Sequence, residues 1–565
     1  MPRTTVAAVL ECFDDEFAEV ATAFARGEYL LWLGSGISRE VVPDVPTLLR
    51  RVLEFLQTNL VTADPACRFR AALAEILGMA GSPGAAVDLT TDVGSWPNLG
   101  EIIDNLVNQY SHVLDVPVEG EAPDYLVWSV LDVPLTYGAA DLEPDVEHLC
   151  IAVLMLEGVV QSAPTTNWDG LVEKAMQLLT GDCDPVLKVI VATADFWGPD
   201  RRAELVKFHG CAVRATQDAD EYRKRLIARS SQISGWTEKP ENKMMKDRLG
   251  FLFGSRPAFI VGLSAQDANI QTVFHMAIQN LSRTWPSSPP AVVFAEHTLR
   301  AHHRLVMKVI YGDDRYSENS SAINSSALLG AYAKPTLLGL VLFTLADKLS
   351  ALIGYVTELD LPAADLERIR SDVRDLRDAA SAMAEPDNRA FVDSLVSVVT
   401  LALWVFRKGD VPNPAPYDAL SAAPIAQAAL HPDFPGTALG RFALAFTLLG
   451  RGLLDGQWTL EPGSASNPAD GVVCVRKGPR TSKAFVVRDT RVLSNLESAG
   501  IIDMTDPEVI IAQAEAVRRP ATRSPRGSYG RSGTSGARLI DLETMFASVN
   551  TADELFQDFV LAGAL

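Results

Sequence analysis

Short apolar segments recur through the first part of the chain, and each stops abruptly at small or polar residues. They have the length of β-strands, and helical stretches lie between them. Continuous apolar runs of this kind are typical of parallel strands that are buried on both faces. Their alternation with helices predicts an open α/β sheet. The segments are 28–33, 159–166, 187–195, 203–210, 258–264 and 291–296.

The pattern divides the chain into two parts, as expected because 565 residues are too many for one ordinary domain. We predict a Rossmann-like parallel sheet over residues 1–320, with a helical insertion at about 47–130 where Gly and Pro interrupt the helices. Residues 321–565 are predicted to form a mainly α-helical assembly or sensor domain with a β-hairpin at 471–490. Residues 518–538 hold arginines and no acid, which predicts a disordered loop.

The composition excludes several classes of protein. The formal net charge of −21 argues against direct binding to nucleic acid or to an anionic membrane. The 6 cysteines form no C-x-x-C pair, so we expect no zinc ribbon, no metal and no disulfide framework. A cytoplasmic location follows from the scattered cysteines and from an N-terminus without a signal core. The apolar segment 337–356 contains Asp347 and Lys348, which favours a buried helix over a membrane span.

A glycine loop follows the first apolar segment. Gly34, Ser35, Gly36 and Ser38 come directly after it, and glycine lets a backbone approach a pyrophosphate closely. A tight turn into a helix with no ligand explains the same residues. The third glycine of the dinucleotide fingerprint is missing, because position 39 is Arg. The chain has no G-x-x-x-x-G-K-[ST] motif either, which excludes a nucleoside triphosphate held in the usual P-loop way.

Polar residues also follow three later segments, at the edge where open α/β sheets bind ligands. Each group has an ordinary structural explanation when it is taken singly: a helix cap, a hydrogen-bonded histidine or a polar turn. The groups are Thr166, Asn167 and Asp169 at the end of 159–166 and just beyond it, His209 at the end of 203–210, and Gly262, Ser264 and Asn269 at the end of 258–264 and just beyond it.

The order of these motifs carries a resemblance to a known family. G-S-G-x-S, T-T-N-x-D, K-x-H-G and V-G-x-S-x-x-D-x-N-I resemble the sirtuin family, and they are most similar to the sirtuin-like NAD hydrolases of bacterial anti-phage defence. The resemblance covers residues 20–310, and His148 stands at the family's histidine position in the helix before T-T-N. Protein-deacylating sirtuins carry a four-cysteine zinc module and a G-I-P-D-F-R stretch, and this chain has neither. Both departures fit the hydrolase branch.

The resemblance implies NAD⁺ as the substrate and a set of site residues. Asn167 would hold the attacking water or the nicotinamide ribose, Asp169 would orient that loop, and His209 would act as general base. The pyrophosphate would lie at the glycine loop, and the adenosine end would lie at the loop after 258–264. The implied NAD⁺ contacts are Gly34, Ser35, Gly36, Ser38, Thr166, Gly262, Ser264 and Asn269.

The resemblance also implies a gate, because an unregulated NAD⁺ hydrolase would kill its own cell. We expect a homo-oligomer that acts in abortive infection with a HerA-like hexameric ATPase, a short Argonaute or a phage trigger protein. Two other functions stay open. The same site could transfer ADP-ribose to a macromolecule, or the chain could be a non-catalytic scaffold that binds NAD⁺ or another nucleotide.

Overall fold

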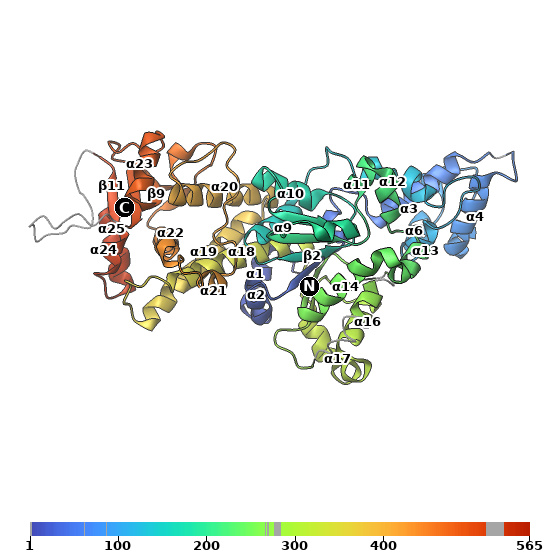
Figure 1. Ribbon diagram of the computed structural model, residues 1–565, viewed down its shortest axis with the longest axis horizontal. Coiled ribbons are helices and arrows are strands. Elements are labelled where there is room, and N and C mark those ends of the chain that lie inside the picture. The colour runs from blue at the N-terminus through green and yellow to red at the C-terminus, as the bar shows by residue number, and fades with distance from the viewer. Residues whose placement is uncertain are drawn as a thin grey trace, which may run out of the picture.

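The structure of the protein is a computed structural model that describes residues 3–61, 63–85, 87–265, 267, 270–275, 284–515 and 536–565. Figure 1 shows an elongated molecule with a parallel sheet near its middle. The helical insertion lies at one end of the molecule, and a second sheet lies at the other end. The helical insertion and the second sheet are therefore far apart in space.

The predicted parallel sheet is confirmed. Its strands run in the order β3-β4-β2-β1-β5-β6, and every pairing between them is parallel. Leu33 pairs with Thr165 on one side and with Val261 on the other, so the carboxyl ends of β1, β2 and β5 lie side by side. The strands are β1 (Leu30–Leu33), β2 (Ser162–Thr165), β3 (Leu187–Ile190), β4 (Ala203–Lys207), β5 (Ala258–Val261) and β6 (Val292–Ala295).

Both faces of this sheet are buried, which explains why its strands are apolar throughout. Leu31 and Leu33 belong to one core, whereas Leu30 and Trp32 belong to another, because successive side chains point to opposite faces of a strand. The first core is formed with α1 (Val6–Asp14), α2 (Ala18–Ala25), α9 (Val146–Leu156), α10 (Leu171–Thr180) and α18 (Ala333–Ile353). The second is formed with α14 (Lys243–Ser255), α16 (Ala301–Tyr311) and α17 (Asp313–Ala327).

The insertion between β1 and β2 is helical, as predicted, and has a core of its own. Its first helix begins at a cap: the Asp44 side chain accepts a hydrogen bond of 3.0 Å from the amide of Thr47, and Pro46 occupies the first turn. The insertion contains α3 (Val45–Thr58), α4 (Arg68–Met79), α5 (Ser82–Ala85), α6 (Leu99–Val107), α7 (Tyr110–Val113), a π-helical turn (Leu126–Val130) and α8 (Val133–Thr136).

Short helices also connect the strands on the β3–β4 side of the sheet. They come from two stretches, one after β3 and one between β4 and α14. These helices are η4 (Thr193–Trp197), α11 (Ala212–Gln217), α12 (Ala219–Tyr222), η5 (Arg223–Arg225), α13 (Ser230–Gly235), η6 (Trp236–Glu238) and η7 (Pro240–Asn242).

The rest of the chain is mostly helical and contains a second sheet that is larger than the predicted hairpin. The hairpin exists as β8 and β9, and it belongs to a five-stranded sheet of order β11-β10-β9-β8-β7. The strands are β7 (Thr459–Pro462), β8 (Val473–Lys477), β9 (Arg480–Asp489), β10 (Val509–Glu515) and β11 (Arg538–Asp541). The helices are α19 (Ala363–Ala384), α20 (Asn388–Arg407), α21 (Ile425–Ala428), α22 (Leu439–Leu454), α23 (Thr490–Ser498), α24 (Leu542–Phe546) and α25 (Ala552–Gly563).

The predicted arginine-rich loop falls mostly outside the described residues, since 516–535 are not among them. Its last member, Arg538, begins β11 and donates a hydrogen bond of 3.0 Å to the carbonyl of Gly563. That end of the predicted loop is therefore an ordered strand.

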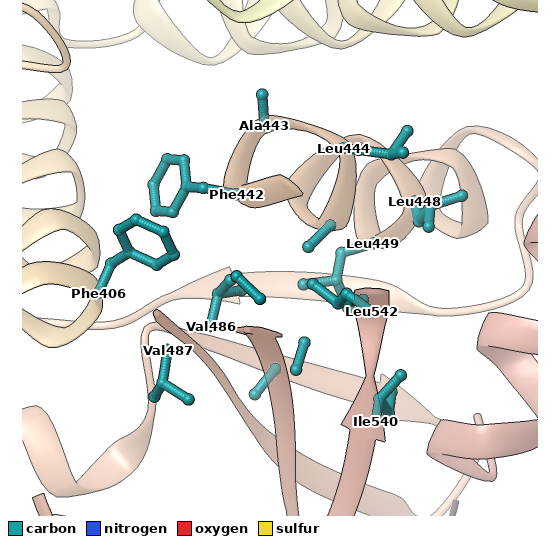
Figure 2. Packing of buried hydrophobic residues seen from close by; sticks show 14 of the residues in the cluster. Phe406, Phe442, Ala443, Leu444, Leu448, Leu449, Val486, Val487, Ile540 and Leu542 are labelled. Carbon is teal, nitrogen blue, oxygen red and sulfur yellow. The ribbon is translucent and has the colours of Figure 1, made fainter. Parts of the chain in front are cut away.

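Helices and the second sheet share one core. Figure 2 shows Phe406 of α20 facing Phe442 of α22, and their ring centroids are 4.8 Å apart. The apolar side of α22 lies over Val486, Ile540 and Leu542 of the sheet region. The full burial of such side chains stabilises a fold by about 2 kcal/mol each. The C-terminal region is thus a packed α/β unit.

Among the residues that the structure describes, two helices, α18 and α20, are long and apolar enough to cross a membrane by length and composition. In α18, 72% of the apolar window is buried inside the molecule, as the sequence predicted for this segment. Its Lys348 is 1% exposed and donates to the carboxylate of Glu157 at 2.6 Å, so the charge inside the helix is paired. In α20 the buried share of the window is 39%. The burial of α18 is that of a core helix.

Candidate functional site

A cavity of about 580 Å³ lies between the carboxyl edge of the first sheet and the helical insertion. This position matches the general location of ligand sites in open α/β sheets, and the volume is in the ordinary range for a small-molecule site. Four separate loops of the sheet reach it, as does the loop after β6. The predicted site residues that line it are Ser35, Thr166, Asn167, Asp169, His209, Gly262 and Ser264.

Gly34 and Gly36 allow the loop after β1 to pack closely against the loop after β5. The amide of Gly34 donates to the carbonyl of Val261, and the amide of Gly36 donates to the carbonyl of Gly262, both at 2.9 Å. A Cβ on Gly34 would lie 2.4 Å from the Gly262 carbonyl oxygen, and Gly262 itself has a φ of +68°. Among residues 34–36, Ser35 is the one that lines the cavity.

Ser38 lies behind the cavity wall, fully buried, and connects the other predicted residues. Its Oγ is 3.0 Å from Nε2 of His148, and it donates to Oδ2 of Asp169 at 3.1 Å. The side-chain amide of Asn167 donates to the same Oγ at 3.2 Å. Ser38 therefore holds the Asn167 and Asp169 side chains together. Asn269, the remaining predicted contact, is outside the described residues.

The tautomer of His148 follows from its second hydrogen bond. Its Nδ1 accepts from the backbone amide of Asp145 at 3.1 Å, so Nε2 carries the proton and donates to Ser38. Burial lowers the pKa of His148, although the charge of Asp169 acts in the opposite direction. The ring is therefore neutral at pH 7, and the Ser38 hydroxyl accepts two hydrogen bonds while it donates one.

Asn167 presents an unpaired acceptor. The residue is 7% exposed, and its backbone amide donates to Oγ1 of Thr165 at 3.0 Å. Its side-chain Oδ1 is buried and has no hydrogen-bond partner in the part of the chain that the structure describes. A buried carbonyl oxygen without a partner is costly, by about 1–3 kcal/mol. The unpaired oxygen belongs to a residue that lines the cavity.

Lys207 supports the Asn167–Asp169 loop, and the sequence reasoning assigned it no role. Its side chain is fully buried, and its ammonium donates to Oε1 of Glu173 at 2.8 Å and to the backbone carbonyl of Asp169. Burial opposes the charge, yet the neighbouring acidic groups, Glu173 among them, raise the pKa of Lys207 above its usual value. The lysine of K-x-H-G was visible in the sequence, but its target lies 38 residues away.

His209 follows β4 and is 3% exposed at the cavity wall. Its backbone carbonyl accepts from the amide of Ile227 at 2.9 Å. Gly210 has a φ of +95°, and a Cβ there would lie 2.5 Å from the Arg225 carbonyl oxygen. The glycine is therefore required by close packing against the backbone of residues 225–227.

The insertion contributes a residue that sequence reasoning missed. Tyr110 of α7 donates from its hydroxyl to Oδ1 of Asp267 at 2.7 Å, and both residues line the cavity. Burial and the charge of Asp267 raise the pKa of Tyr110, so the phenol stays protonated and keeps this hydrogen bond. No local signal could have paired two residues 157 positions apart in sequence.

The far end of the cavity holds mixed charge. Burial raises the pKa of Glu296, whereas the guanidinium groups of Arg300 and Arg39 act in the opposite direction. His303 beside them is fully buried and lies 3.2 Å, through Nε2, from the carbonyl of Leu263. Glu296 is the last residue of the apolar segment 291–296. Its place at a strand end was the one feature of the sequence that could have predicted it as a site residue.

The fold and site define a class of protein with a Rossmann-like sheet and a small-molecule cavity at its carboxyl edge. Residues 161–308 match the family model described as SIR2-like domain. The match begins one residue before β2 and ends inside α16, so it includes Asn167, His209 and Gly262 but not the glycine loop. It supports a sirtuin-like family, whose domains are in general NAD-dependent enzymes with NAD⁺ as substrate. A comparison with curated proteins gave no match.

Proposed function

We propose that this protein is an NAD⁺ glycohydrolase that releases nicotinamide and ADP-ribose. The observation that supports this most is that Asn167 and His209 line one cavity, with Oδ1 of Asn167 buried and unpaired. A binding site alone needs neither a buried amide oxygen without a partner nor an imidazole beside it. The SIR2-like match supports the use of NAD⁺.

The reaction breaks the bond between the nicotinamide nitrogen and C1′ of the ribose. Positive charge then develops on the ribose, as in glycoside cleavage. Nicotinamide is cationic while it is bound and leaves as a neutral molecule, so no carboxylate nucleophile is needed. Water supplies the hydroxyl that forms the new bond to C1′, and one proton is released.

The side chains of the cavity divide this work. Oδ1 of Asn167 accepts a hydrogen bond from the attacking water or from a hydroxyl of the nicotinamide ribose, which fixes its position. His209 takes the proton, and a positioned base of this type contributes about 10²–10⁴-fold in rate. Ser38 and His148 do not touch the substrate in this scheme; they hold the Asn167 amide in one orientation.

The deciding experiment is nicotinamide release from NAD⁺ by the purified full chain, measured together with the fate of labelled ADP-ribose. Free ADP-ribose in equal amount to nicotinamide supports hydrolysis. Label that stays on a macromolecule, with little free ADP-ribose, would instead make the protein an ADP-ribosyltransferase. Tight NAD⁺ binding with no nicotinamide release, even with partner and trigger added, would make it a scaffold.

We also propose that the activity is gated and serves anti-phage defence by NAD⁺ depletion in the cytoplasm. The chain has no P-loop motif, so a partner such as a HerA-like hexameric ATPase would have to supply any ATP hydrolysis. A short Argonaute or a phage protein is the other kind of trigger we propose. Nicotinamide release that is the same with and without each of these candidates would contradict the gate while leaving the chemistry intact.

A further inference from the structure

A second cavity, of about 360 Å³, lies at the carboxyl ends of β3 and β4. None of the predicted site residues that the structure describes lines it. Its volume is within the range of small-molecule sites, and its place at the strand ends is one where open α/β sheets bind ligands. It is lined by Val191, Ala192, Thr193, Phe208, Gly210, Lys224, Arg225, Ile227, Trp236, Lys239, Glu241, Asn242 and Met245.

The inner wall of this cavity is aromatic and apolar. Trp236 is 1% exposed and Phe208 is 3% exposed, and their rings meet edge to face with centroids 5.9 Å apart. The wall therefore offers a flat apolar surface.

The rim of the cavity is basic. Lys224 and Arg225 belong to it and share one partner, Glu221, at 3.0 Å and 2.6 Å. Lys239 is exposed and has no ion pair in the described part of the chain, while Glu241 is the one acid of the lining. Cations gathered on a chain of net charge −21 favour an anionic ligand at this place.

A thin partition separates this cavity from the first one. Ile227 lines both cavities, and its amide donates to the His209 carbonyl at 2.9 Å. Phe208 and Gly210 face the second cavity, whereas His209 between them lines the first. The two cavities are therefore neighbouring but distinct spaces.

We propose that the second cavity binds a small organic anion with a flat ring, of the class of a nucleoside monophosphate. The ring packs on Trp236 and Phe208, and the anionic group lies at the rim beside Lys239 and Lys224. The proposal goes beyond the NAD⁺ chemistry of the first cavity and does not depend on it, because binding is the quantity it predicts.

The test is calorimetric titration of the full chain with AMP, and with inorganic phosphate to measure the contribution of charge alone. AMP is expected to bind saturably and more tightly than phosphate. Lys239→Glu should weaken the tighter binding about tenfold, because a like charge replaces an attractive one at the rim. Lys477→Glu makes the same charge change on exposed β8 and should leave the affinity unchanged.

Arg300→Glu distinguishes AMP binding in the first cavity from AMP binding in the second, because Arg300 lines only the first. AMP binding that is weakened by Lys239→Glu but not by Arg300→Glu places the ligand in the second cavity. The proposal is overturned if AMP shows no saturable binding, if Lys239→Glu has no effect, or if only Arg300→Glu weakens the binding. Circular dichroism of each variant shows whether it is folded, so a lost site is told apart from a lost fold.

Discussion

At the residue scale, the arrangement of the first cavity depends on a small number of buried hydrogen bonds. Asn167 and His209 are the groups that the proposed reaction uses, and neither is a core packing residue. We expect Asn167→Ala or His209→Ala to abolish nicotinamide release while the melting temperature stays within a few degrees of the wild type. Nicotinamide release checks the loss of activity, and a thermal melt of the same preparation checks that the variant is as stable as the wild type. Full activity of His209→Ala would remove that residue from the mechanism.

Ser38 gives a second prediction at this scale. Ser38→Ala leaves the buried N–H groups of Asn167 and His148 without their acceptor, and each such loss costs about 1–3 kcal/mol. If about half of that is felt in the transition state, nicotinamide release should fall by about tenfold, and unfolding should become easier. Ser498→Ala is the matched control, because it removes the same hydroxyl from an exposed position at the end of α23, away from the cavity. A kcat of Ser38→Ala equal to the control would contradict the positioning role.

Glu147 predicts a pH dependence of stability. Burial raises the pKa of this carboxyl from 4.5 to about 7, and the ammonium of Lys334, 3.9 Å away, only partly offsets the burial. A raised folded-state pKa gives stability that is present below pH 4.5 and is lost as the pH rises towards and through about 7. Glu147→Gln should therefore gain stability relative to the wild type at pH 8 but not at pH 4. Urea unfolding at both pH values measures this, and equal differences at both would contradict it.

At the element scale, α9 joins the two halves of the molecule. All of its residues are buried; His148 near its start binds Ser38, and Glu157 directly after its end binds Lys348 of α18. Glu157 also accepts from the hydroxyl of Tyr417 at 2.7 Å. The helix thus connects the cavity to the C-terminal region through hydrogen bonds at both ends.

The Glu157–Lys348 pair predicts a large stability effect. Burial lowers the pKa of Lys348, and the charge of Glu157 acts against that shift. Lys348→Met would leave the Glu157 carboxylate buried without its cation, which costs about 3–5 kcal/mol in comparable cases. Adding Glu157→Gln should recover part of the loss, because the unpaired charge is then removed. Denaturant unfolding of both variants is the measurement, and a single variant as stable as the wild type would contradict the prediction.

The elements also show what could be predicted from the sequence. The strands of the first sheet were found because burial on both faces makes each of them a continuous apolar run, and the hairpin β8–β9 was found from its central Gly-Pro. The strands β10 and β11 were missed because they are separated in sequence from the hairpin they extend. In the site, Asn167 and His209 lie at strand ends and were predicted, whereas Tyr110 and Lys207 act through long-range contacts that no local pattern encodes.

At the scale of the whole molecule, exposed apolar side chains bear on assembly. Trp197 is 81% exposed, Leu135 is 72% exposed and Leu430 is 83% exposed. Single exposed apolar residues are common, but large ones are enriched at protein interfaces. We therefore predict a homo-oligomer. Light scattering during size-exclusion chromatography checks this, and a mass of 61.1 kDa at all concentrations would contradict it.

If the buried contacts at the two ends of α9 couple the cavity to the C-terminal region, that coupling is reciprocal. A molecule bound at the C-terminal region could change the affinity of the cavity for a ligand. Thermodynamic linkage then requires that the ligand change the affinity for that molecule by the same factor. Ligand binding in the cavity would then change the binding affinity of the C-terminal region. Under the proposed function, the NAD⁺-bound and NAD⁺-free forms of the protein would then differ in their affinity for a partner at the C-terminal region.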